Sequence, residues 1–421
     1  MHSPKGPKRM KSEQKYLPYG RQCLTQGDID AVVAVLKSDF LTQGPTVEAF
    51  EKAIAEYLGC SDVIVMNNAT AALHIAYLSL GVEKGSAVIV PAITFAATAN
   101  AAVYCGGVPF FCDVDPVSGL MTPELLEQAV IKCKAQGLKP KLCVPVHYAG
   151  MAVDMNGIIE VAKKHSMKVF EDACHAIGGD IRASETSPWR KVGNAFDGSA
   201  GCSFSFHPVK HIATGEGGAV ATNDPEFAKK LRLIRTHGIT KSSENFVDSK
   251  MAFDKKSGLV NPWYYEMQEL GWNYRLSDIN AALGLSQMGR LVANIQKRRQ
   301  IATWYHENLS GLPLVRPCGE TILTRHAWHL YPLLIDFENI GVSRFEMFRE
   351  LKQRGVGAQV HYIPVPSLPY YKKSGAVVPP GARKFYDMEL SIPMYPDLTR
   401  ADVDRVSDAL KDILTPSKKA F

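Results

Sequence analysis

The sequence contains no apolar run that approaches the roughly 18 residues needed to cross a bilayer. Residues 1–11 are basic but are not followed by an apolar stretch, so they do not form a secretory signal and are better interpreted as a disordered arm. These features predict a cytoplasmic protein that does not work at a membrane.

The nine cysteines include no Cys-x-x-Cys pair, and several lie inside apolar runs, as Cys143 does. This usage suits buried thiols in a reducing compartment and argues against a zinc site or a disulfide framework. A clustered basic face with base-stacking aromatic residues is also missing, so we expect no nucleic-acid partner. The net charge of +6 would favour an anionic substrate, although part of it lies in the two tails.

The chain has 421 residues, of which 46% are apolar and 21% are charged, as is typical of a packed globular protein. A chain of this length normally forms about two or three domains. We predict an arm at residues 1–15, a large domain at 16–290 and a smaller C-terminal domain at 291–421.

Short apolar strands alternate with helices through the first part of the chain. Strands that are buried on both faces and separated by helices indicate an α/β fold with a mostly parallel mixed sheet. After about residue 315 the pattern changes to that of a smaller α+β domain, and the polar stretch 241–258 is predicted to be an exposed loop. The predicted helices include 26–36, 47–58 and 70–80, and the predicted strands include 63–66, 87–90, 108–112, 142–146, 168–170, 202–206, 331–335 and 357–361.

Three predicted strands end in polar residues at the edge where α/β sheets bind ligands. Strand 63–66 leads into Asn68-Ala69-Thr70 and a helix, whose N-terminus could bind a phosphate or could be an ordinary capped helix end. Asp172 follows strand 168–170 and could hold a protonated ring nitrogen. Two alternatives for Asp172 are a metal site shared with His175, for which no third ligand is evident, and a turn aspartate bonded to nearby backbone.

Lys210 follows strand 202–206 and precedes a glycine-rich loop. A lysine in a partly apolar pocket has a lowered pKa, which frees its amine to form a Schiff base. His207 could carry protons near that amine or could be a hydrogen-bonded structural histidine. Phe95 could stack on a planar cofactor, although an isolated phenylalanine is more often a core residue. Together these elements fit pyridoxal 5'-phosphate (PLP) as the cofactor.

Several segments resemble one known family. Ser-Phe-His-Pro-Val-Lys-His at 205–211 and Thr-Gly-Glu-Gly-Gly at 214–218 are similar to the signature of the sugar nucleotide aminotransferases, the DegT/DnrJ/EryC1/StrS family. Further similarities lie at Glu171-Asp172-Ala173, Asn273-Tyr274-Arg275-Leu276 and His361-Tyr362-Ile363-Pro364, and the resemblance spans about residues 18–415. The sequence departs from the family's pattern at Asn68-Ala69-Thr70, where many members have Ser-Gly-Thr.

The resemblance implies a PLP-dependent aminotransferase of fold type I that works as a homodimer. Lys210 would form the Schiff base and Asp172 would pair with the pyridinium nitrogen, so these two would be the catalytic residues. The other cofactor contacts would be Phe95 on the ring, His175 near its phenolic edge, Ala69, Thr70 and Ser205 at the phosphate, and Asn273 reaching into the partner's site. The substrate contacts would be Tyr19, Asp39, Phe40, Leu41, Thr42, His361, Tyr362, Ile363 and Pro364.

Within the family, residues 236–239 and 263–266 resemble the branch that makes an intermediate of pseudaminic acid. The resemblance implies transfer of an amino group from L-glutamate to C4 of a UDP-linked 4-keto-6-deoxy-N-acetylhexosamine. Two alternatives are an aminotransferase for another nucleotide-linked 3- or 4-keto sugar and a non-catalytic regulatory protein with the same fold.

Overall fold

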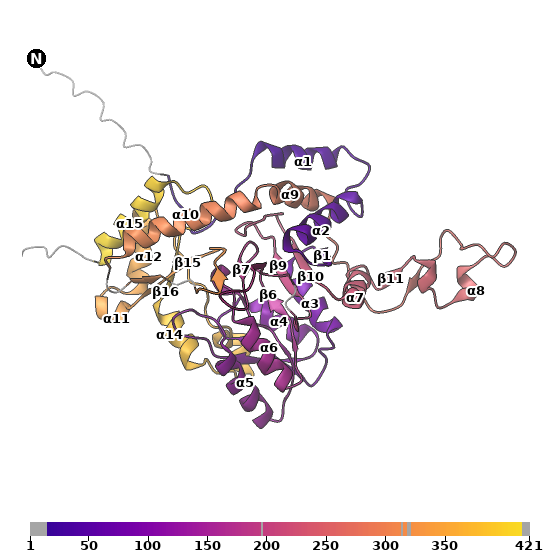
Figure 1. The fold of residues 1–421 in the computed structure, drawn as a ribbon, viewed down its shortest axis with the longest axis horizontal. Coiled ribbons are helices and arrows are strands. Elements are labelled where there is room, and N and C mark those ends of the chain that lie inside the picture. Colours follow the sequence, from indigo (N-terminus) through magenta and orange to yellow (C-terminus); the bar gives the residue numbers. More distant parts are fainter. Residues whose placement is uncertain (1–14, 195–196, 313–314, 318–320, 415–421) are drawn as a thin grey trace, which may run out of the picture.

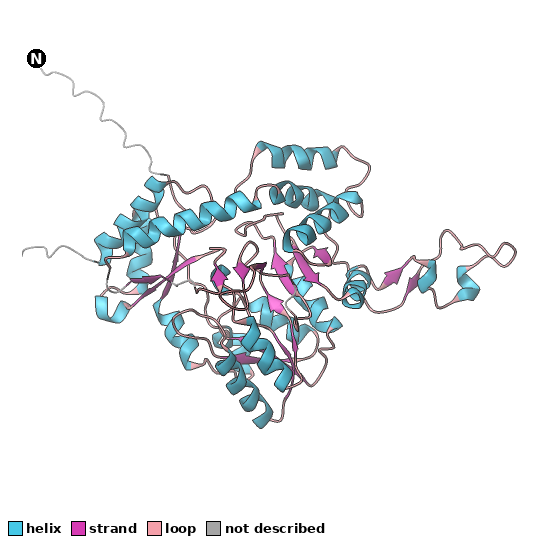
Figure 2. Cartoon of the chain, in the orientation of Figure 1, coloured by secondary structure: helices cyan, strands magenta, loops and turns pink. Residues whose placement is uncertain are grey.

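The computed structural model describes residues 15–194, 197–312, 315–317 and 321–414, so nearly all of the predicted N-terminal arm lies outside the described residues. A mixed sheet runs through the larger part of the molecule (Figures 1 and 2). In one part the order is β3-β2-β4-β5 and every pairing is parallel. In the other part the order is β1-β10-β9-β6, in which β10 is antiparallel to both of its neighbours and β6 is parallel to β9. The strands are β1 (Asp62–Met66), β2 (Ser86–Pro91), β3 (Val108–Cys112), β4 (Lys139–Cys143), β5 (Lys168–Val169), β6 (Glu171–Asp172), β9 (Cys202–Ser205) and β10 (Gly218–Thr222).

Helices cover both faces of this sheet because its strands bury side chains on both sides. In β1, Val63 and Val65 belong to one hydrophobic cluster, while Ile64 and Met66 belong to a second. The first cluster includes apolar residues of α2 (Pro45–Leu58), α5 (Pro123–Ala135), α6 (Met155–Lys164) and α9 (Asp278–Met288). The second includes those of α3 (Ala69–Ser79), α4 (Ala96–Tyr104) and α7 (Pro225–Arg235). Helix α1 (Gln26–Leu36) packs against α9.

The predicted α/β class with a mostly parallel mixed sheet is confirmed. The predicted strand 142–146 was placed too late, since β4 ends at Cys143. Strand β10 was not predicted, because its sequence Gly-Ala-Val-Ala-Thr is dominated by small residues with weak strand preference.

A second, antiparallel sheet of order β13-β15-β16 lies in the C-terminal part of the chain. Its strands are β13 (Val315–Pro317), β15 (Tyr331–Ile335) and β16 (Glu389–Ile392), and β15 confirms the strand predicted at 331–335. The prediction of a strand at 357–361 was wrong. Gln359 makes a single bridge to Ser391, and the chain then enters the wall of the cavity described below. The helices of this part are α10 (Leu291–Leu309), α11 (Phe337–Ile340), α12 (Arg344–Gln353), α13 (Pro369–Lys373), α14 (Pro380–Met388) and α15 (Arg400–Leu414), with the short helix η3 (Val365–Ser367).

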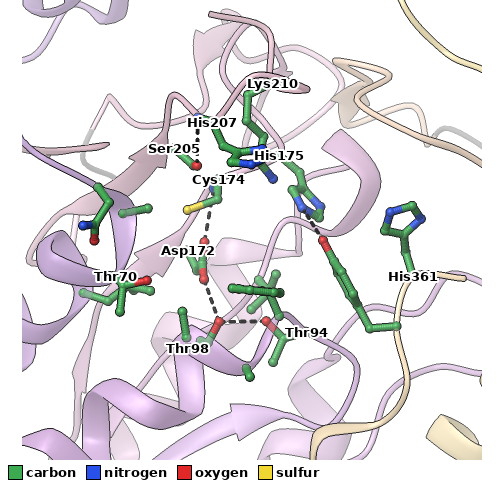
Figure 3. Close-up of a pocket in the computed structure, with 18 of the residues that line it drawn as sticks. Thr70, Thr94, Thr98, Asp172, Cys174, His175, Ser205, His207, Lys210 and His361 are labelled. Atoms are coloured by element: carbon green, nitrogen blue, oxygen red, sulfur yellow. Dashed lines mark hydrogen bonds between the residues drawn. The ribbon is translucent and has the colours of Figure 1, made fainter. Parts of the chain in front are cut away.

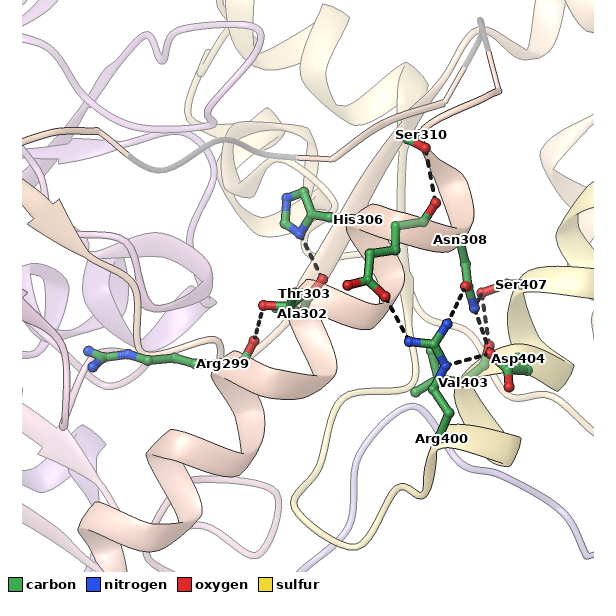
Figure 4. Close-up of polar contacts among 11 residues, drawn as sticks. Arg299, Ala302, Thr303, His306, Asn308, Ser310, Arg400, Val403, Asp404 and Ser407 are labelled. Carbon is green, nitrogen blue, oxygen red and sulfur yellow. Dashed lines mark hydrogen bonds and ion pairs between the residues drawn. The ribbon is translucent and has the colours of Figure 1, made fainter.

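Polar contacts join α10 to α15 beside their apolar contact (Figure 4). Arg400 of α15 contacts Glu307 of α10 at 2.8 Å, and Asn308 of α10 donates to Asp404 of α15 at 2.9 Å. Arg400 also pairs with Asp404 within α15 at 3.0 Å. Since both ion pairs are substantially exposed, they contribute little net stability. The shared hydrophobic cluster, which includes Tyr305 and Val406, therefore holds the two helices together.

A long excursion leaves the body between β11 (Ile239–Thr240) and β12 (Glu266–Met267) (Figure 1). From here on we call residues 239–267 the arm, as distinct from the N-terminal arm predicted at residues 1–15. The exposed loop predicted at 241–258 lies in it and contains two short helices, η2 (Ser243–Asn245) and α8 (Ser249–Ala252). The remaining elements are η1 (Tyr148–Gly150) and a small sheet of β7 (Asp180–Ile181), β8 (Arg190–Lys191) and β14 (Thr324–Arg325). Within the described ranges, no helix has the length and apolar character of a membrane span.

Candidate active site

A cavity of about 980 Å³ opens where the predicted strand ends meet (Figure 3). The segments that follow β1, β6 and β9 all contribute to its wall, so the three polar strand ends do lie together. Residues far along the chain, from Gln359 to Ile363, complete the wall. The predicted site residues that line it are Tyr19, Ala69, Thr70, Phe95, Asp172, His175, Ser205, Lys210, His361, Tyr362 and Ile363.

Lys210 lies in the turn after β9 and its side chain lines the cavity. Its backbone N–H donates to the carbonyl of His207 at 2.8 Å, and its Nζ lies 3.4 Å from Nε2 of His329. Desolvation lowers the pKa of the Lys210 amine to about 8, against the opposing effect of Cys174 and Asp172. A substantial share of this amine is therefore neutral near physiological pH, as a nucleophilic amine requires.

Asp172 presents a buried carboxylate to the same cavity. Its Oδ2 accepts a hydrogen bond from Thr98 Oγ1 at 2.8 Å, and its Oδ1 accepts one from the backbone N–H of Cys174 at 3.1 Å. The Thr98 hydroxyl also contacts that of Thr94 at 2.8 Å. The bond to Cys174 is the one expected of a turn aspartate, but the same carboxylate is also fixed on the cavity wall, where it can face a bound ring.

The start of α3 lies on the cavity wall, where a helix N-terminus suits an anion, and we call this end the cradle. Asn68 caps the helix by accepting from the backbone N–H of Ala71 at 2.8 Å, while the earlier N–H groups of Ala69 and Thr70 have no acceptor within the helix. Gly218 on β10 passes so close that a Cβ there would lie 2.5 Å from the backbone nitrogen of Ala69. Ser205, which is paired with Gly218, ends β9 at the same place.

A group of neutral histidines borders Lys210. Nδ1 of His175 accepts from the backbone N–H of Ala149 at 3.3 Å, so its Nε2 carries the proton and donates to the Tyr362 hydroxyl at 2.9 Å. The rings of His175 and His329 are 4.4 Å apart. Burial lowers the pKa of both histidines well below its usual value. Both ring nitrogens of His175 are therefore engaged in hydrogen bonds. The described residues include no group of three or more His, Cys, Asp or Glu arranged to bind a metal.

Phe95 and His207, for which the sequence allowed two interpretations each, both line the cavity. Phe95 is the N-cap of α4, is 61% exposed and lines the cavity, so it is not a core residue. His207 is exposed at the cavity, where its backbone N–H donates to Ser205 Oγ at 3.5 Å, and the role of its ring stays a prediction.

Other predicted site residues lie outside this cavity. Residues 39–42 form an exposed loop between α1 and α2, where the carbonyl of Leu41 accepts from the backbone N–H of Asp278. Pro364 lies between the lining residues Ile363 and Val365 but does not itself line the cavity. Asn273 is exposed at the base of the arm and pairs with Thr236. Because the structure describes one chain, roles for these residues at a shared site stay predictions.

Sequence reasoning missed two neighbours of the reacting groups. Thr98 holds Asp172 from the first turn of α4, and its hydroxyl contacts that of Thr94, which precedes the helix. His329, beside Lys210, comes from a segment more than a hundred residues further along the chain. No local pattern distinguishes it from an ordinary core residue.

The residues of the cavity fit PLP. An amine of lowered pKa, a fixed carboxylate and a helix N-terminus with nearby hydroxyl groups face one space. These are the groups needed for an aldehyde, a pyridine nitrogen and a phosphate respectively. Lys210, Asp172, and the cradle of Ala69, Thr70 and Ser205 would hold the cofactor at these three points.

The chain matches known proteins over nearly its whole length. The model of the DegT/DnrJ/EryC1/StrS aminotransferase family matches residues 22–411. The UDP-4-amino-4,6-dideoxy-N-acetyl-beta-L-altrosamine transaminase of Campylobacter jejuni is 36% identical over 406 residues, which cover 96% of this chain and 99% of that protein. The spore coat polysaccharide biosynthesis protein SpsC of Bacillus subtilis is 36% identical over 408 residues, with 95% and 97% covered.

A solved structure shows the same likeness in three dimensions. Helicobacter pylori PseC, an aminotransferase involved in the biosynthesis of pseudoaminic acid, superposes with a TM-score of 0.83 at 30% sequence identity. The match covers 95% of this chain and 99% of that one. It therefore extends over the described segments that build the cavity.

Proposed function

The chain belongs to the DegT/DnrJ/EryC1/StrS aminotransferase family, whose members use PLP, and from this premise we propose its substrate. It transfers an amino group from L-glutamate to C4 of a UDP-linked 4-keto-6-deoxy-N-acetylhexosamine, as in pseudaminic acid biosynthesis. The observation that carries the aminotransferase chemistry is the amine of Lys210 in one cavity with the fixed carboxylate of Asp172. The names of the Campylobacter and Helicobacter relatives support the choice of sugar.

Bound PLP supplies an electron sink for the carbanion character that develops when the donor loses its α-proton. Asp172 would keep the ring nitrogen protonated, since its carboxylate is held by Thr98 and Cys174. Lys210 would anchor the cofactor and, once its amine is freed, would accept and return protons at Nζ. Its lowered pKa suits this exchange near neutral pH.

The wall opposite the phosphate cradle would bind the sugar nucleotide. Tyr19, His361, Tyr362 and Ile363 line it. We propose that the active unit is a homodimer, in which Asn273 and the loop at residues 39–42 serve a site shared between subunits. Apolar side chains on the arm support this proposal, because Val247 is 84% and Trp263 is 76% exposed in the single chain.

A panel of keto sugars tests the substrate proposal. UDP-, dTDP- and GDP-linked 4-keto sugars and a UDP-linked 3-keto sugar are each incubated with the PLP-loaded enzyme and L-glutamate, and 2-oxoglutarate release is measured. We expect the UDP-linked 4-keto-6-deoxy-N-acetylhexosamine to react fastest, with the configuration at C4 read from the NMR spectrum of the product. A faster reaction with another sugar would favour the alternative specificity.

A non-catalytic regulatory role makes a different prediction. A transaminase loaded with PLP loses its yellow colour when glutamate alone is added, because the amino group is transferred to the cofactor. A regulatory protein keeps its colour under these conditions. Retention of the colour with every amino donor tried would contradict the enzymatic proposal.

A further inference from the structure

Strand β16 places two polar side chains on one buried face. Leu390 and Ile392 point into the C-terminal hydrophobic cluster, while the alternating Glu389 and Ser391 face the other way. Glu389 and Ser391 are both fully buried, at 0% exposure. A carboxyl group at such a position requires hydrogen-bonding partners, because its burial without them is costly.

The partners of Glu389 lead to the cavity through His361. The backbone N–H of His361 donates to Glu389 Oε2 at 2.8 Å. The Ser391 hydroxyl lies 2.5 Å from Glu389 Oε1 and 2.9 Å from Nδ1 of His361. His361 lines the cavity, on the side away from Asp172 in Figure 3, and its carbonyl accepts from the Tyr148 hydroxyl at 2.6 Å.

A hydroxyl group between two partners can donate to only one of them, because it has a single proton. If Glu389 is ionised, Ser391 donates to the carboxylate, and Nδ1 of His361 must carry the proton that it donates to Ser391. If Glu389 is protonated, it donates to Ser391, and Ser391 donates to an unprotonated Nδ1. The neutral imidazole then carries its proton on Nε2.

We propose that Glu389 is a positioning residue that selects, through Ser391, the tautomer that His361 presents to the cavity. With Glu389 protonated, Nε2 of His361 is a hydrogen-bond donor, which suits a carbonyl or phosphate oxygen of the substrate. With Glu389 ionised, Nε2 is an acceptor, which suits a hydroxyl or ammonium group. The inference rests on the proposed function only for the identity of the ligand that meets Nε2.

The surroundings of Glu389 place its loss of a proton close to the pH at which the enzyme would work. Burial raises the pKa of Glu389 to about 8, although Ser391, the His361 amide, the Arg344 guanidinium of α12 and Tyr148 of η1 act in the opposite direction. The transition therefore falls near the working range of an enzyme with a nucleophilic amine.

His361 itself stays neutral across this transition. Burial, with a smaller contribution from Lys210, lowers the pKa of His361 to about 3. Tyr19 and Tyr362 also face its ring, and burial raises the pKa of both phenols, so they remain uncharged. The change at His361 is thus one of tautomer and not of charge.

Nitrogen NMR of the PLP-loaded enzyme, labelled with ¹⁵N-histidine and free of substrate, reads the tautomer directly. The resonances of His361 are identified by their loss in the His361→Gln variant. Between pH values well below and well above the Glu389 pKa of about 8, we expect the protonated nitrogen to change from Nε2 to Nδ1. A single tautomer throughout that range would overturn the proposal.

Two substitutions separate the roles of the partners. In Glu389→Gln the amide oxygen can accept from the His361 N–H while the NH₂ group donates to Ser391, so the variant should keep the Nε2–H form at every pH. Ser391→Ala removes the connecting hydroxyl and should abolish the transition, even if the first variant does not fold. Asp387→Asn is the matched control, since Asp387 is exposed two residues before Glu389, and it should titrate as the wild type does. A wild-type transition in Glu389→Gln or Ser391→Ala would contradict the proposal.

Kinetics then connect the tautomer to the substrate. If Nε2–H donates to the keto sugar, KM of the wild type should rise about tenfold above the transition, as for the loss of one good hydrogen bond, while KM of Glu389→Gln stays constant. An unchanged wild-type KM would exclude that contact. The NMR result is independent of the sugar, so failure of the keto-sugar assay would refute the proposed substrate and leave the tautomer result standing.

Discussion

Lys210 supplies the cavity with a reactive amine, and Asp172 supplies it with a fixed carboxylate. Replacement of Lys210 by alanine removes the amine without disturbing a packed core. We expect turnover to fall by at least about 10²–10⁴-fold while the variant still folds and unfolds cooperatively. Assays of glutamate-dependent amination and calorimetry check this, with Lys52→Ala, at an exposed lysine of α2, as the control. Full activity in Lys210→Ala would exclude its proposed role.

The lowered pKa of Lys210 also predicts a pH-dependent stability of the cofactor-free protein. The pKa of the amine is about 8 in the folded state, while that of an unfolded lysine is about 10.4. Between these values the unfolded state binds more protons, so stability rises with pH, and below about 8 the full cost of a desolvated ammonium applies. Lys210→Met should therefore unfold at a higher temperature than the wild type at pH 7, and the difference should shrink towards pH 10. Calorimetry across this range would contradict the prediction if the difference were constant.

Asp172→Asn tests the charge of the carboxylate while it preserves the shape of the side chain. The amide oxygen can still accept the hydrogen bond from Cys174, so we expect PLP to bind. Because the ring nitrogen loses its anionic partner, transamination should slow by about 10²-fold or more. Stopped-flow absorbance after glutamate addition measures this step, and a wild-type rate would remove Asp172 from its proposed role.

At the scale of elements, the close approach of β10 to the start of α3 shapes the proposed phosphate cradle. In Gly218→Ala the new Cβ would meet the backbone of Ala69, at 2.5 Å from its nitrogen, so one of the two elements must move. We expect PLP to dissociate at least about tenfold more readily, with about 1–3 kcal/mol lost from the free energy of unfolding. Gly311→Ala is the control, because a Cβ at Gly311 meets no atom within 4 Å. Equal PLP affinity in the two variants would show that the cradle does not depend on this contact.

At the scale of the whole molecule, the arm supports the proposed dimer. A charge at Trp263 would be tolerated in a monomer, where the side chain is 76% exposed, but not in an apolar interface. We expect Trp263→Asp to shift the sedimentation profile towards monomer and to reduce activity. Phe345→Asp provides a control of equal exposure, 76%, on α12. If both variants sediment as the wild type does, the arm is not the dimer contact.

The sequence by itself determined the class of fold and the centre of the site. Alternation of apolar strands with helices predicts an α/β sheet, and the residues that follow such strands gather at one edge of it. Lys210, Asp172 and Ala69-Thr70 could be placed together for this reason, since each lies at the end of a strand or within a few residues of it. Local patterns were sufficient because a residue that closely follows a strand lies near the end of that strand.

Only the tertiary structure decided what surrounds that centre. Thr98 meets Asp172, His329 meets Lys210, and Glu389 meets His361 across long separations in the chain. Such contacts depend on packing between segments, which leaves no periodic pattern in the sequence of either partner. The antiparallel strand β10 was missed for a related reason, because its small residues are suited to the close approach to α3 and have little strand preference of their own. The reacting groups could therefore be predicted from the sequence. The groups that contact and position them could be identified only from the tertiary structure.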